Sequence, residues 1–105
     1  SQEGLALIGI GEYKGKDAAY NALQKVIKSP LSNDLLISGA KGMLVSFSIS
    51  DTYSLYDIEK EMDLIYESVD PDADIIFGTS TSEEMAEDEV KVVIVATGLE
   101  KVRVI

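Results

Sequence analysis

Apolar and polar positions follow two different periods in the first third of the chain. Leu5–Ile10 is a short, nearly unbroken apolar run that ends at Gly11, which is typical of a buried strand. Residues 12–16 are mostly charged and contain a glycine, so we expect a turn there. Residues 18–27 then carry apolar side chains at spacings of three and four, which predicts an amphipathic helix. This helix should end just before Pro30, because a proline disfavours helical geometry in the residue that precedes it.

The middle of the chain predicts a connector, a strand and a second helix. Residues 31–42 indicate a connector, with a possible short strand at Leu35–Ile37. Met43–Ser50 alternates between apolar residues and serines, so one face of this strand should be packed and the other polar. Ser54 and Asp57 resemble a capping box at the start of a helix. The apolar stripe of that helix consists of Leu55, Ile58, Met62, Ile65 and Val69, and Glu61 is expected among the polar residues around the rest.

The last third predicts two further strands and completes the fold class. Ile75–Thr81 and Val90–Thr97 are strand-like, and the polar segment Ser82–Glu89 connects them. The order β-α-β-α-β-β predicts an α/β fold: a two-layer sandwich, with a mixed sheet of about four strands and two helices on one face. We expect a single domain over residues 1–105. The serine-lined face of Met43–Ser50 would then have no cover within this chain.

Composition excludes several classes of function. The chain has 105 residues, a net charge of −10 and neither Cys nor His. The negative charge disfavours binding to nucleic acid or to anionic membranes. The lack of Cys and His removes thiolate sites and the commonest general base, and it mildly favours a reducing, cytoplasmic location. The chain begins with Ser rather than Met, which leads us to expect a piece of a longer protein.

Two motifs suggest metal or nucleotide binding, and both fail on spacing. The alternating aspartates of Asp70–Asp74 resemble a calcium loop, but Ile75 and Thr81 occupy the positions that require Gly and Glu. We therefore expect a turn there, in which Asp72 and Asp74 bond nearby backbone groups. Gly9-Ile10-Gly11 resembles part of a dinucleotide fingerprint, but the third glycine is missing. The glycines are better explained by close backbone packing.

The remaining polar segments offer no catalytic set. Gly78–Ser82 has no lysine and is not a phosphate-binding loop, and the acidic run Glu83–Glu89 is typical of a solvated loop. The residues alone therefore favour an interaction or assembly domain over an enzyme active site.

Several segments, in this order, resemble the C-terminal domain of the FtsZ family, the bacterial tubulin-like cell-division GTPases. They are "ALIGIGE" (Ala6–Glu12), "SPL" (Ser29–Leu31), "ISGAKGMLVSFS" (Ile37–Ser48), "SLYDIEKEMDLIYESVDPDADIIFGT" (Ser54–Thr79) and "DEVKVVIVATGLE" (Asp88–Glu100). The resemblance implies a GTPase that polymerises into the division-ring filament and hydrolyses GTP, with Mg²⁺, between stacked subunits. Its GTP site would lie in a separate N-terminal domain. We therefore expect no catalytic, nucleotide-binding or metal-binding residue and no cofactor in this chain.

The resemblance also implies two contact surfaces. The longitudinal contact between subunits corresponds to Asp51, Tyr53, Leu55 and Asp57. The sheet face away from the helices would lie against the family's long central helix, across a cleft that corresponds to Ser46, Ser80, Ser82, Val93 and Val95. The implied partners are other FtsZ subunits and the protein's own N-terminal GTPase domain. One departure is Ile49-Ser50, where the family usually has two glycines, so the contact loop is expected to differ in shape.

Two rival interpretations remain open from the residues. One is a small-molecule enzyme of chorismate-mutase-like topology, although such enzymes gather cations around an acidic substrate and the nine Lys and Arg residues are scattered here. The other is a standalone domain that acts through protein contacts.

Overall fold

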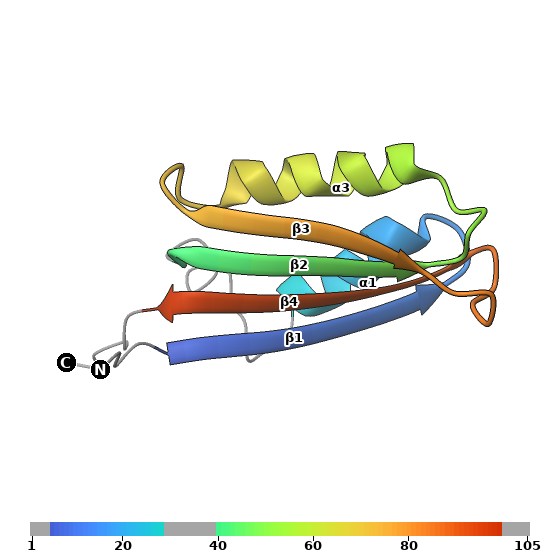
Figure 1. Ribbon diagram of the computed structural model, residues 1–105, viewed down its shortest axis with the longest axis horizontal. Coiled ribbons are helices and arrows are strands. Elements are labelled where there is room, and N and C mark those ends of the chain that lie inside the picture. Colours follow the sequence, from blue (N-terminus) through green and yellow to red (C-terminus); the bar gives the residue numbers. More distant parts are fainter. Residues whose placement is uncertain (1–4, 29–39, 100–105) are drawn as a thin grey trace.

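The computed structural model describes residues 5–28 and 40–99, so the possible strand at Leu35–Ile37 lies outside the described residues. These residues form a four-stranded sheet in the order β1-β4-β2-β3, with both helices on one face (Figure 1). Strand β4 is antiparallel to both of its neighbours, while β2 and β3 are parallel. The predicted α/β two-layer fold is confirmed. The elements are β1 (Leu5–Lys14), α1 (Ala18–Ile27), β2 (Gly42–Ile49), α3 (Leu55–Ser68), β3 (Asp74–Thr81) and β4 (Glu89–Leu99).

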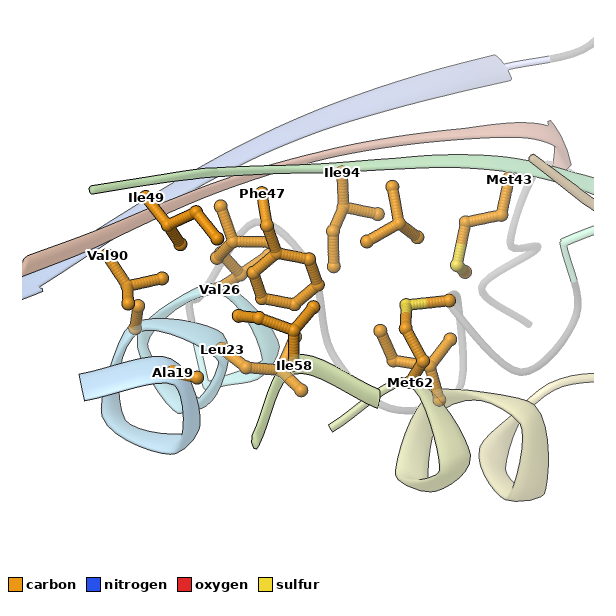
Figure 2. Close-up of a cluster of buried hydrophobic side chains, with 14 of the residues drawn as sticks. Ala19, Leu23, Val26, Met43, Phe47, Ile49, Ile58, Met62, Val90 and Ile94 are labelled. Atoms are coloured by element: carbon orange, nitrogen blue, oxygen red, sulfur yellow. The ribbon is translucent and has the colours of Figure 1, made fainter. Parts of the chain in front are cut away.

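The hydrophobic core lies between the helices and one face of the sheet (Figure 2). Phe47 of β2 is fully buried at its centre, and its ring meets Phe77 of β3 edge-on at 6.1 Å between ring centroids. Leu23 of α1 and Ile58 of α3 point into the same cluster from the helical layer. The alternation predicted for β2 and β4 is confirmed, because the buried side chains of the two strands are paired in register. The β2 set is Met43, Val45, Phe47 and Ile49, and the β4 set is Ala96, Ile94, Val92 and Val90.

Helix α1 lies very close to β1 because two positions of the strand are glycine. A Cβ atom on Gly11 would come within 2.1 Å of the carbonyl oxygen of Ala22, and one on Gly9 within 2.6 Å of a Val26 methyl group. Real Cβ atoms essentially never approach other atoms so closely. The close packing predicted for Gly9-Ile10-Gly11 is confirmed, and these residues belong to a paired strand.

The predicted start of α3 is also confirmed. The Ser54 hydroxyl accepts a hydrogen bond from the Asp57 N–H at 3.3 Å. The helix ends at Ser68, and the following turn differs from prediction in its side-chain bonds. The carboxylate of Asp70, rather than that of Asp72 or Asp74, accepts the Asp72 N–H at 2.8 Å. Asp70 is the first aspartate of the turn, so its side chain reaches the N–H two residues on.

The prediction for β1 was wrong in two respects. Residues 12–14 are not a turn but extend the strand, since they pair with the start of β4 and Tyr13 packs against the core. The turn lies at residues 15–17, where Gly15 and Asp17 have positive φ. The strand is also not buried on both sides, because Ile8 and Ile10 are 67% and 59% exposed.

Candidate functional site

One face of the sheet has no helix over it within the described residues (Figure 1). Paired strand residues point to the same side, so the register identifies which side chains share this face. We call it the open sheet face. Its central positions are Ile8 and Ile10 of β1, Val93 and Val95 of β4, Leu44, Ser46 and Ser48 of β2, and Ile76, Gly78 and Ser80 of β3.

The open sheet face is more apolar than its serines suggested. Ile8 and Ile76, on the two edge strands, are each 67% exposed, and Leu44 between them is 45% exposed. The serines lie towards one end of this surface: Ser48 and Ser80 are paired near the carboxyl ends of β2 and β3, and their hydroxyls are 3.2 Å apart in a hydrogen bond. The open sheet face is therefore apolar at one end and polar towards the carboxyl ends of β2 and β3, and an exposed apolar patch of this kind is typical of a surface covered by another protein segment.

The predicted cleft residues lie mainly on this face. Ser46 is paired with Val93 of β4, and Val95 and Ser80 share the same side of the sheet. Ser82 follows the end of β3, and its hydroxyl accepts the Glu84 N–H at 3.1 Å, so it shapes the connection to β4 instead. Sequence reasoning missed the apolar part of the face. The signal was available in Leu7-Ile8 of β1, because adjacent residues of a strand point to opposite faces and one of the two must face away from the core.

The predicted subunit-contact residues lie together where β2 leads into α3 (Figure 1). Asp51 is exposed, Leu55 is 56% exposed, and Tyr53 and Asp57 are partly buried. The carboxyl ends of β1, β2 and β3 meet at this end of the sheet, as does the first turn of α1. We call the segment Asp51–Asp57 the contact loop. Ile49 and Ser50, which directly precede the contact loop, are 1% and 4% exposed. The side chains that stand where the family usually has two glycines are therefore buried.

Tyr53 ties the contact loop to α1. Its hydroxyl accepts a hydrogen bond from the Ala19 N–H at 3.1 Å. Helix α1 lacks a side-chain cap because Asp17, at its N-cap, has a left-handed backbone, so the tyrosine satisfies one of the free N–H groups of the first turn. Burial raises the pKa of the Tyr53 hydroxyl above its usual value, and the hydroxyl stays protonated at neutral pH.

A small acidic pocket lies beside this hydrogen bond, between the first turn of α1 and the first two turns of α3. Its volume is about 40 Å³. Glu61 lines it and is only 7% exposed, and its Oε1 atom is buried without a hydrogen-bond partner. The pocket residues are Asp17, Ala19, Tyr20, Tyr53, Asp57, Lys60 and Glu61.

The predicted position of Glu61 on the polar side of α3 was therefore wrong. Glu61 follows Ile58 by three residues, so it lies one turn along the same buried side, where α3 faces α1. Burial raises the pKa of its carboxyl above the usual value, while Lys60 acts in the opposite direction. The three-residue spacing from Ile58 indicated that Glu61 is buried, but its charge led to its assignment to the polar side of the helix.

The glycines of the two motifs singled out in the sequence lie within the sheet. Gly9, Gly11 and Gly78 lie inside paired strands, so their backbone does not form a free phosphate-binding loop. Within residues 5–28 and 40–99 there is no group of three or more acidic side chains arranged to hold a metal ion.

Comparison with known proteins identifies the family. The sequence profile of the FtsZ family, C-terminal domain, matches residues 4–100. The chain belongs to the FtsZ family. It is 41% identical over 99 residues to the cell division protein FtsZ of Helicobacter pylori strain J99, a match that covers 94% of this chain and 26% of that protein. The corresponding protein of strain 26695 is 39% identical over the same length.

Solved structures agree with the sequence comparison. An FtsZ dimer from M. jannaschii, described as empty, superposes with a TM-score of 0.78 at 34% identity. That match covers 90% of this chain and 27% of the other. TubZ of Bacillus thuringiensis serovar israelensis, described as a GTPγS-form protofilament, has a TM-score of 0.69 at 8% identity, which shows a shared fold alone. The predicted family and its tubulin-like fold are confirmed.

These matches also define what the chain represents. The chain spans about a quarter of the length of the FtsZ proteins it matches and corresponds to their C-terminal domain. Among the described residues, no helix is both long enough and apolar enough to span a membrane.

Proposed function

We propose that this chain is the assembly domain of a longer, cytoplasmic, filament-forming FtsZ GTPase, and that it acts through subunit contacts. The observation that carries the proposal is the match over residues 4–100 to only about a quarter of each relative. In this proposal GTP and Mg²⁺ bind outside the chain, which itself contributes no catalytic residue. Its partners are further FtsZ subunits and its own N-terminal GTPase domain.

The contact loop is the surface we assign to the neighbouring subunit. Leu55 is a large apolar side chain exposed at the first position of α3, and Asp51 beside it is exposed and charged. An apolar side chain within a polar rim is the usual composition of a protein–protein contact. The loop is held in a defined shape by the Ser54 cap and by the Tyr53–Ala19 hydrogen bond. Binding should therefore cost little conformational entropy in this loop.

The open sheet face is the surface we assign to the rest of the same protein. Ile8, Leu44 and Ile76 expose apolar area across three strands, which costs free energy in water unless another segment covers it. The long central helix that the family resemblance implies is the cover we propose. The predicted cleft residues Ser46, Ser80, Val93 and Val95 would face it, with Ser82 at the end of the cleft.

The contact assignment is tested by Leu55→Asp in the longer protein that carries this chain. An aspartate is well tolerated in the first turn of a helix, so the fold should survive while the apolar contact is lost. We expect sedimentation of filaments with GTP and Mg²⁺ to fall to background. The control is Leu64→Asp, since Leu64 lies on the same helix, is 41% exposed and is outside the contact loop. Equal assembly by both variants would refute the assignment.

The location of the nucleotide site is tested with the chain by itself. Calorimetric titration with GTP and Mg²⁺ should release no heat of binding, because Gly9, Gly11 and Gly78 of the two glycine motifs lie in paired strands. Micromolar affinity would overturn the proposal. The same result would revive the small-molecule enzyme alternative, which no cluster of cationic side chains among the described pocket residues favours at present.

A further inference from the structure

The acidic pocket holds one carboxylate oxygen that the described part of the chain leaves without a hydrogen-bond partner. Glu61 is 7% exposed, and no hydrogen bond reaches its buried Oε1 atom. A buried carboxylate is costly unless it is paired, and native proteins rarely retain one without a function. The pocket therefore lacks a positively charged or hydrogen-bond-donating group.

The nearest charged neighbours do not supply that group. Asp57 and Asp17 are both negative, and each further raises the pKa of Glu61. Lys60 is the only cation that lines the pocket in the described structure, but its ammonium group lies over the ring of Tyr56, 5.4 Å from the ring centroid. The Tyr56 side chain is 68% exposed, so this contact holds the lysine at the surface.

The size and chemistry of the pocket select the class of ligand. A volume of about 40 Å³ accommodates one small polar group and no metabolite. The described acidic side chains are not arranged to hold a metal ion. An ammonium group is a compact charge with three donors, whereas a guanidinium needs room for a planar fork. Glu61 and Asp57 offer carboxylate acceptors to such a group.

We propose that the acidic pocket receives the ammonium group of a lysine from the neighbouring subunit, with Glu61 as its counter-charge. The inference rests on the proposed function, since the pocket shares Tyr53 and Asp57 with the contact loop. Entry of the lysine supplies the hydrogen-bond donor that the Glu61 Oε1 atom does not have among the described residues. Assembly thereby gains the interaction that the separate chain lacks.

The experiment compares Glu61→Gln with Glu59→Gln in the longer protein that carries this chain. Both variants remove one negative charge from α3, but Glu59 is exposed and does not line the pocket. We expect Glu61→Gln to raise the critical concentration for assembly about tenfold, and Glu59→Gln to change it less than about twofold. The wild-type critical concentration should also rise more steeply with salt than that of Glu61→Gln.

Thermal unfolding separates a contact role from a structural one. A residue that only supports the fold would lower the melting temperature and assembly together when replaced. Glu61→Met provides the second variant, because it fills the same space without a charge. We expect Glu61→Met to weaken assembly, as Glu61→Gln does, but to raise the melting temperature. Assembly and stability would then change in opposite directions, which a purely structural role does not predict.

The outcomes distinguish this inference from the proposed function. If Leu55→Asp abolishes assembly but Glu61→Gln and Glu61→Met assemble like Glu59→Gln, the lysine contact is refuted and the contact loop stands. If Leu55→Asp also assembles normally, both proposals fail. Loss of assembly accompanied by a lower melting temperature in both Glu61 variants would assign Glu61 a structural role and overturn the inference.

Discussion

Gly11→Ala should destabilise the chain strongly, because the new methyl group meets a backbone atom. The added Cβ atom would lie 2.1 Å from the Ala22 carbonyl oxygen, whereas ordinary van der Waals contact begins at 3.4 Å. Helix α1 would therefore have to withdraw by the missing 1.3 Å, the difference between these distances. A backbone oxygen cannot rotate away as a side chain can, so the whole helix must move.

That withdrawal determines the magnitude. Ala22, Leu23 and Val26 of α1 are 0–1% exposed, and moving them outward opens space beneath each. Overpacking of a core costs about 1–3 kcal/mol and sometimes more, and we expect the upper end, about 3 kcal/mol, for a clash with backbone. For a domain of this size, this corresponds to a loss of roughly 12 °C or more in melting temperature.

Urea unfolding followed by far-ultraviolet circular dichroism provides the measurement. The matched control is Gly78→Ala, also a glycine-to-alanine change within a strand, where an added Cβ meets nothing within 4 Å. We expect the free energy of unfolding of the control to lie within about 1 kcal/mol of that of the original chain. If the free energy of unfolding of Gly11→Ala lies within about 1 kcal/mol of that of the control, the added methyl group does not force α1 away from β1 and the reasoning is refuted.

Two further predictions concern α3. Ser54→Ala removes the acceptor for the Asp57 N–H and should lower the free energy of unfolding by about 1 kcal/mol, while Ser54→Asp retains the cap and should not; thermal unfolding of both variants tests this. Glu61→Met should be more stable than the original chain at pH 7, by about 1–3 kcal/mol. Burial raises the pKa of Glu61 in the folded state above its ordinary 4.5, so its penalty is absent below that pH and grows as pH rises towards the folded-state pKa. Urea unfolding at pH 7 and pH 4.5 should show the advantage of Glu61→Met shrinking at the lower pH, and an equal advantage at both would contradict the assignment.

The sequence correctly predicted those elements in which the spacing of apolar residues matches the side chains that are buried in the structure. The alternation of β2 and the cap at Ser54 depend on local geometry, and both were found. Residues 12–14 escaped prediction because their charges suggested a turn, whereas pairing with β4, more than seventy residues away, keeps them extended. Long-range pairing overrides local preference in such segments.

The candidate site was predicted less completely. The family resemblance indicated the contact loop, but the buried position of Glu61 depends on how α1 and α3 face each other. The open sheet face was expected to be polar because the serines of β2 are regular. Its apolar part comes from all four strands, and only the strand order brings Ile8 of β1, Leu44 of β2 and Ile76 of β3 into one surface.

The position of β4 has a consequence for synthesis of the protein. Strand β1 is held in the sheet by β4 alone, and β4 is the last element described in the chain. During translation, β2, α3 and β3 can assemble as one unit, whereas β1 can join the sheet only after residues 89–99 have left the ribosome. Strand β4, the last of the described strands to be made, thus closes the gap between β1 and β2 at the centre of the sheet, and the first and last described strands join the fold in one late step.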